Sequence, residues 1–180
     1  MRMLRGELNR LTELMRELLE YGRPLSSELT PQSIEDVIAE SVEACAALAK
    51  RANVEIANEI RAALPPVYMD RRRLLQVFHN LLENAVQHSP PGGIVTVEAE
   101  TVRDDGRDWV DCVITDSGPG FQTEELPRIF EPFFTRRRGG TGLGLSIVQR
   151  IIEEHHGTIA ASNRPGGRAV MTVRLPSAES

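Results

Sequence analysis

The chain has 180 residues, 41% of them hydrophobic, which is enough for one domain with a sizeable core and one additional element. Its formal net charge is −5, with 21 basic residues against 26 acidic ones, which argues against nucleic acid or an anionic membrane as a partner. No apolar run approaches the roughly 18 to 20 residues that a membrane-spanning helix needs. The two cysteines, Cys45 and Cys112, lack metal-ligand spacing, which indicates reduced thiols and a cytosolic protein.

The first expected element is a helix that ends at Gly22 and Pro24, since a glycine followed by a proline is a typical helix end. Its apolar residues recur at steps of four and three, and they are Leu4, Leu8, Leu11, Met15 and Leu18. So narrow a stripe fits an ordinary core helix and a helix that pairs with a second copy equally well.

Two longer helices are expected at about residues 34–51 and 71–88, with Ser33 and Asp70 as their N-caps. Short strands are expected around residues 54–60 and 67–69. Two hairpins should follow, one around the turn at 104–106 and one joining residues 158–162 to 169–175, with a helix at about 143–155 before the second. Helices mixed with hairpins predict an α+β fold, a two-layer α/β sandwich with one helical layer on a mixed sheet.

Two asparagines lie on the second of these helices. Asn80 and Asn84 are four residues apart and so share a helix face, which differs from the face of Leu81 and Leu82. Such amides either bond neighbouring backbone or bind a ligand. An asparagine oxygen suits Mg²⁺, which takes its other ligands from water and substrate phosphates.

Asp116 follows an apolar strand and precedes Gly118 and Gly120. A buried carboxylate can accept a hydrogen bond from the amino group of adenine, while glycines let the backbone approach the ring. The alternative is an Asx-turn at the end of a strand, which is common.

The third segment, Gly140, Gly142 and Gly144, opens a helix. Backbone N–H groups and the positive helix end make such a start a site for phosphate. A Rossmann motif would need a strand directly before the glycines, and a Walker loop would need a following Gly-Lys-Ser/Thr, so both are disfavoured.

In chain order, residues 70–90, 116–120, 129–135 and 140–144 resemble the N, G1, F and G2 boxes of the ATP-binding domain of sensor histidine kinases. This Bergerat-type superfamily includes DNA gyrase, the mismatch-repair ATPases and the heat-shock chaperone ATPase. The resemblance covers about residues 25–175 and implies ATP and Mg²⁺ as cofactors. It implies that residues 25–180 form the catalytic domain, and residues 1–24 the end of the second helix of the dimerisation and phosphotransfer domain.

The resemblance also implies a role for each matched position. Asn84 would bind Mg²⁺ with help from Asn80, Asp116 would recognise adenine, and residues from about 121 to 141 would form a mobile ATP lid. The other positions expected at the nucleotide are Gln87, His88, Gly118, Gly120, Phe130, Phe133, Thr135, Gly140, Thr141, Gly142, Leu143, Gly144 and Leu145.

Two departures from the family pattern affect the chemistry. Gln87 stands where many members have a phosphate-contacting lysine, and the lid arginines Arg136, Arg137 and Arg138 either compensate for it or are merely solvated. Asn80 stands where the gyrase-like ATPases have a water-activating glutamate, and the neighbouring Glu83 lies on another helix face. The second departure favours a kinase over an ATPase.

The acceptor histidine of the family is missing. None of the four histidines has the sequence context of a phosphorylation site; they are His79, His88, His155 and His156. Each is expected either to be structural or to support the residues that contact the nucleotide. The chain should therefore bind ATP without phosphorylating itself efficiently.

The resemblance implies a cytoplasmic enzyme, either soluble or the cytosolic part of a membrane-bound sensor, that is a homodimer at full length. Phosphoryl would pass from MgATP to a histidine on the dimerisation domain and then to a response regulator. One alternative is a serine kinase of the anti-sigma-factor type, against which the helix ending at Tyr21 to Pro24 argues. Another is a non-catalytic nucleotide-binding module.

Overall fold

The computed structural model describes residues 12, 15, 19, 28–135 and 140–179. Of the expected first helix, Thr12, Met15 and Leu19 lie in this part, and all three are helical and exposed. The rest of that helix, its end at Gly22 and Pro24 and the proposed boundary at residue 24 lie outside the described residues. Among the described helices, none has the length and apolarity of a membrane span.

A five-stranded mixed sheet forms one layer of the fold, with the strand order β2-β4-β5-β7-β6. The strands are β2 (Glu55–Asn58), β4 (Ile94–Asp104), β5 (Arg107–Thr115), β6 (Thr158–Asn163) and β7 (Ala169–Pro176). β2 is parallel to β4, and the other neighbours are antiparallel. Both expected hairpins are therefore present, and the mixed sheet is confirmed.

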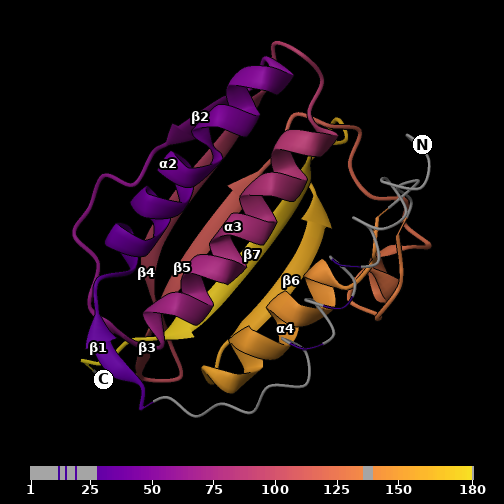
Figure 1. The fold of residues 1–180 in the computed structure, drawn as a ribbon. Coiled ribbons are helices and arrows are strands. Elements are labelled where there is room, and N and C mark those ends of the chain that lie inside the picture. Colours follow the sequence, from indigo (N-terminus) through magenta and orange to yellow (C-terminus); the bar gives the residue numbers. More distant parts are fainter. Residues whose placement is uncertain (1–11, 13–14, 16–18, 20–27, 136–139, 180) are drawn as a thin grey trace.

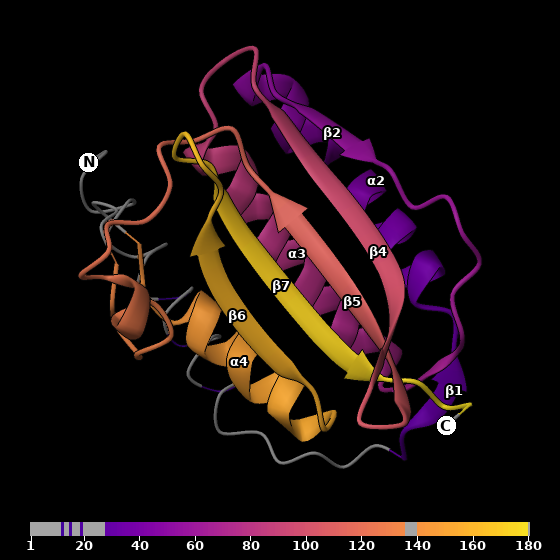
Figure 2. The same ribbon diagram turned by 180° about the vertical axis from the view of Figure 1, so that it is seen from behind.

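Three helices form the second layer and cover one face of the sheet (Figures 1 and 2). They are α2 (Ile34–Ala52), α3 (Arg71–His88) and α4 (Gly144–Glu154). The Ser33 hydroxyl accepts a hydrogen bond from the Asp36 N–H, and the Asp70 carboxylate accepts one from the Arg73 N–H, so both expected caps are confirmed. The two-layer α/β sandwich is thus the observed architecture.

The strand expected at residues 67–69 is confirmed as β3 (Val67–Met69), and it pairs with β1 (Thr30–Gln32) in a separate antiparallel sheet. This pairing was not predicted, and neither was a 3-10 helix, η1 (Leu126–Arg128), which lies between β5 and α4. β3 immediately precedes α3, so the small sheet lies at the beginning of that helix.

The core lies between the helices and the covered face of the sheet. Side chains on this face alternate with those on the open face, as the pleat of a strand requires. The central helix α3 contributes fully buried residues that include Leu74 and Phe78, and the strands contribute Val97, Val110 and Cys112. Burial raises the pKa of the Cys112 thiol to about 12, so it is an unreactive core residue.

His155 follows α4 and joins it to the start of α3. Its ring is almost fully buried; Nε2 accepts a hydrogen bond from the Asp70 N–H at 3.0 Å, and Nδ1 lies 2.7 Å from the Ile151 carbonyl oxygen. Since a carbonyl can only accept, Nδ1 carries the proton and the ring is neutral. Burial lowers the pKa of His155 below 6.5, despite the opposing influence of the Ile151 carbonyl and the Asp70 carboxylate.

The buried, neutral ring of His155 should make the free energy of unfolding decrease in mild acid. Below about pH 6.5 the unfolded chain binds a proton at residue 155 that the folded chain does not, so the free energy of unfolding should decrease by up to about 1.4 kcal/mol per pH unit. Urea denaturation at about pH 7.5 and about pH 5.5 measures the loss. His155→Gln keeps an acceptor but does not titrate and should lose less, whereas the exposed control His88→Gln should behave as wild type. An equal loss in wild type and His155→Gln would contradict the buried neutral ring.

Candidate nucleotide-binding site

The two asparagines lie in the C-terminal half of α3. Asn80 and Asn84 are both half-buried, and neither side chain hydrogen-bonds another residue in the described part of the chain. Their amide oxygens are therefore open to a ligand. The described residues contain no group of three or more His, Cys, Asp or Glu side chains able to hold a metal ion, so a metal bound at this helix would depend on these amides and on the substrate.

Glu83 faces away from the asparagines, as expected. Its carboxylate accepts a hydrogen bond from Gln87 Nε2 at 2.8 Å and lies 3.8 Å from His79 Nε2. His79 Nδ1 in turn lies 3.4 Å from the Cys45 thiol on α2. This row of side chains therefore points toward α2, and the side chain of Gln87 is turned toward Glu83.

Asp116 is placed directly after β5 and is 7% exposed. Its Oδ1 accepts hydrogen bonds from the Gly118 N–H at 2.8 Å and from the Ala169 N–H at 3.2 Å. The first of these is the Asx-turn expected as the alternative. Within the described residues Oδ2 makes no hydrogen bond, so the turn leaves one carboxylate oxygen as an acceptor for a ligand.

The glycines of this loop are required by contacts between chain segments. A methyl group at Gly118 would lie 2.5 Å from the His88 carbonyl oxygen, and one at Gly120 would lie 1.7 Å from the carbonyl oxygen of Gly167. Gly120 also has a φ of +79°, which glycine adopts most readily. The loop is thus wedged between the end of α3 and the turn that joins β6 to β7.

The second glycine segment contacts Phe133, in the stretch expected to form the lid, in a similar way. A methyl group at Gly142 would lie 2.5 Å from the carbonyl carbon of Phe133, and the Phe133 N–H donates to the Gly142 carbonyl at 2.8 Å. Phe133 itself has a φ of +68° and is 60% exposed. By contrast, a methyl group at Gly144 would contact nothing within 4 Å.

The start of α4 carries no side-chain cap. Its N-cap residue is Leu143, which is buried in the core, so the first N–H groups of the helix are not occupied by a capping side chain. The Thr141 hydroxyl accepts only a long hydrogen bond, 3.4 Å, from the Leu143 N–H. Because the positive helix end adds to these donors, this position suits an anion.

The remaining expected residues differ in exposure. Gly140, Phe130 and Leu145 are half-buried, the last two against the core, whereas His88 and Thr135 are exposed. The lid arginines Arg136, Arg137 and Arg138 lie outside the described residues. Figure 1 shows that α3 and β5 end at the same end of the molecule, and that the loop leading to α4 starts there.

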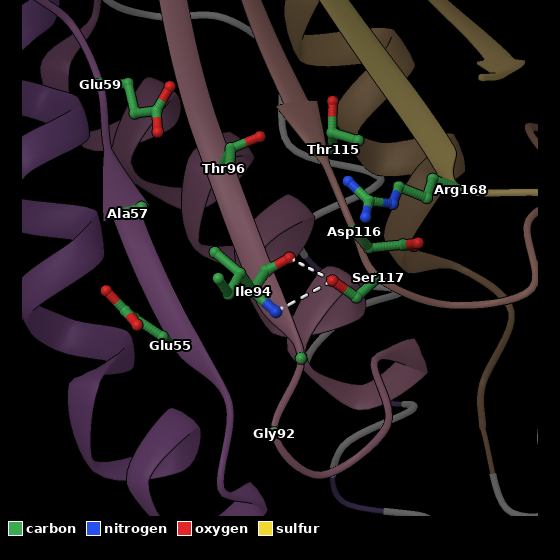
Figure 3. A pocket seen from close by; sticks show the side chains of 11 residues that line it. Glu55, Ala57, Glu59, Gly92, Ile94, Thr96, Thr115, Asp116, Ser117 and Arg168 are labelled. Atoms are coloured by element: carbon green, nitrogen blue, oxygen red, sulfur yellow. Dashed lines mark hydrogen bonds between the residues drawn. The ribbon is translucent and has the colours of Figure 1, made fainter. Parts of the chain in front are cut away.

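A separate cavity of about 420 Å³ lies on the open face of the sheet, away from the helices (Figure 3). Its walls come from β2, β4, the end of β5 and Arg168, and of the expected site residues only Asp116 borders it. Asn84 and Gly142 do not line this cavity, so it is distinct from the region between α3 and α4.

The contribution of the β6–β7 hairpin to the site was not predicted from the sequence. Ala169 exchanges backbone and side-chain hydrogen bonds with Asp116, and Asn163 holds the backbone of Phe121. Gly166 and Gly167 were a signal for a turn, but nothing in the local pattern indicated that this turn contacts a loop about 45 residues away.

A family model described as "Histidine kinase-, DNA gyrase B-, and HSP90-like ATPase" matches residues 69–179. Sensor histidine kinase ZraS of Salmonella typhi is 36% identical over 170 residues, which are 94% of this chain and 36% of that protein. The chain thus spans about a third of the length of this relative.

Two solved structures of histidine kinases are similar over nearly the whole chain. Full-length ShkA in complex with AMPPNP has a TM-score of 0.83 at 29% identity, covering 98% of this chain and 38% of that one. Histidine kinase ThkA in complex with the response regulator protein TrrA has a TM-score of 0.79 at 30% identity, covering 97% of this chain and 49% of that one. The chain therefore belongs to the family of histidine kinase-, DNA gyrase B- and HSP90-like ATPases, and its ATP-binding domain is of the sensor histidine kinase type.

Proposed function

We propose that this chain is the part of a sensor histidine kinase that binds MgATP and presents its γ-phosphoryl group to a histidine on another domain. The proposal depends on one observation: the Asp116 loop packs tightly against His88, the last residue of α3. This contact brings Asp116 Oδ2 close to the helix that carries the side-chain amides of Asn80 and Asn84, and none of these three groups hydrogen-bonds another described residue.

Each part of the nucleotide has a proposed position. Adenine donates its amino group to Asp116 Oδ2, and the triphosphate extends toward the uncapped start of α4. Mg²⁺ binds the phosphates and the amide oxygen of Asn84, with Asn80 assisting. The lid from about residue 121 to 141 closes over the phosphates, and its arginines offset the missing cation at Gln87.

Transfer to a protein side chain is favoured over hydrolysis. A hydrolase needs a base within reach of the attacking water, and the nearest carboxylate on α3, Glu83, is engaged with Gln87 and His79. Positioning and charge stabilisation suffice for phosphoryl transfer once an acceptor histidine is brought to the γ-phosphate.

The partners follow from the relatives. ZraS is named a sensor histidine kinase, ShkA was solved with AMPPNP, and ThkA was solved with a response regulator. We therefore propose a histidine-bearing dimerisation domain of the same protein as the phosphoryl acceptor, a response regulator as the next acceptor, and a cytoplasmic homodimer at full length.

Labelled ATP tests this function. The chain is incubated with a separately produced histidine-bearing helical domain, ATP labelled at the γ-phosphate, and Mg²⁺. We expect label on the helical domain that is lost in acid, because phosphohistidine is acid-labile. Acid-stable label on serine would support the serine kinase instead, and ATP binding without any transfer would support a non-catalytic module.

A further inference from the structure

We propose that Asn163 is a positioning residue for the nucleotide site, which holds the Asp116 loop and the start of the lid in the geometry that binds ATP. The inference rests on the proposed function and adds a residue that ends β6 and lies outside the nucleotide motifs.

Asn163 binds the backbone of a distant residue at two points. Its Oδ1 accepts a hydrogen bond from the Phe121 N–H at 2.8 Å, and its Nδ2 donates to the Phe121 carbonyl oxygen at 2.8 Å. The side-chain amide of Asn163 thus pairs with both the backbone N–H and the backbone carbonyl of one residue, as a residue of a neighbouring β-strand would. Alanine and an ionised aspartate cannot provide both bonds.

The close packing around Gly120 makes this contact possible. The site of a methyl group at Gly120 lies 2.6 Å from Asn163 Oδ1, and one at Gly167 would lie 3.0 Å from the Pro119 carbonyl oxygen. Both glycines have positive φ, +79° and +109°. The loop and the turn therefore approach each other more closely than side chains would permit, and this approach brings Asn163 within bonding distance of Phe121.

The other end of the loop is held by the same hairpin. The Asp116 N–H donates to the Ala169 carbonyl at 3.1 Å, and the Ala169 N–H donates to Asp116 Oδ1 at 3.2 Å. Residues 116–121 are thus attached to the β6–β7 hairpin at both ends. Because Ala169 and Asn163 are themselves paired across that hairpin, the two attachments form one unit.

The lid begins where this unit ends. The Phe121 side chain packs against the core, and the next carbonyl, that of Gln122, accepts hydrogen bonds from the N–H groups of Glu125 and Leu126 in the first turn of the lid. Asn163 thus fixes the residue from which the lid extends. Without it, the loop and the lid must be ordered when ATP binds, and that ordering opposes binding.

The test uses three variants of the chain and isothermal titration with MgATP. Asn163→Ala should raise the dissociation constant by about three- to tenfold. Asn163→Asp keeps the acceptor for the Phe121 N–H but replaces the donor with a second acceptor oxygen facing the Phe121 carbonyl, and should also weaken binding. Ser162→Ala, at the exposed preceding residue on β6, should bind as wild type.

Melting temperatures without nucleotide separate positioning from simple stability. We expect both Asn163→Ala and Asn163→Asp to weaken ATP binding at a temperature well below their melting temperatures, where both variants are folded. If Asn163→Ala binds ATP with the same affinity as wild type, the inference is overturned and the proposed function still stands, even if the melting temperature of the variant is lower. No ATP binding by the wild-type chain would overturn both.

Discussion

Asp116→Asn is expected to weaken ATP binding by about tenfold or more. The substitution keeps Oδ1 as the acceptor for the Gly118 and Ala169 N–H groups but replaces Oδ2, the proposed acceptor for adenine, with an amide donor. A buried hydrogen bond to a charged group contributes about 1.5 to 3 kcal/mol, and 1.4 kcal/mol is a factor of ten in affinity. Isothermal titration with ATP measures the change.

The matched control is Asp105→Asn, which removes the same charge at the turn between β4 and β5. Its affinity should equal that of wild type. GTP, which has a carbonyl where adenine has its amino group, should bind wild type poorly. Equal ATP affinity for wild type and Asp116→Asn would remove base recognition from Asp116.

Asn84→Ala is expected to abolish most of the gain in ATP affinity that Mg²⁺ provides. The Asn84 amide has no partner in the described part of the chain, so its removal should cost little folding stability, while the metal loses a protein ligand. ATP titrations with Mg²⁺ and with a chelator give the difference between the two affinities for each variant.

Gln76→Ala is the control for this substitution, because it removes an amide from the same helix, about 12 Å earlier along its axis. It should keep the full effect of Mg²⁺. A loss of affinity in Asn84→Ala that is the same with and without Mg²⁺ would show that the side chain supports packing rather than the metal.

The elements with strong local signals were predictable. α3 runs from Arg71 to His88 as expected, because the Asp70 cap marks its start and eighteen residues of helical periodicity define its buried face. The turn at Asp105 and Gly106 likewise has positive φ at both residues, as an Asp-Gly hairpin requires. The convergence of the Asp116 loop with the end of α3 followed from the family resemblance, since no local pattern encodes it.

The rest depended on contacts between distant segments. β1 and β3 have three residues each and are separated by more than thirty, so neither carries enough pattern to predict the pairing. The close packing of Gly118 and Gly120 against the carbonyls of His88 and Gly167 was not predicted, because each contact joins segments far apart in the sequence. Asn163 was missed for the same reason, because its partner, Phe121, is 42 residues away.

The most direct test of one shared site is the change in backbone amide shifts when MgATP is added to the isotopically labelled chain. A site between α3 and α4 predicts simultaneous changes at Asn84, Gly118 and Gly142, while Ala57 and Thr96, in the cavity on the open face of the sheet, stay unchanged. Changes confined to Ala57 and Thr96, or none at Asn84 and Gly142, would contradict the nucleotide site described above.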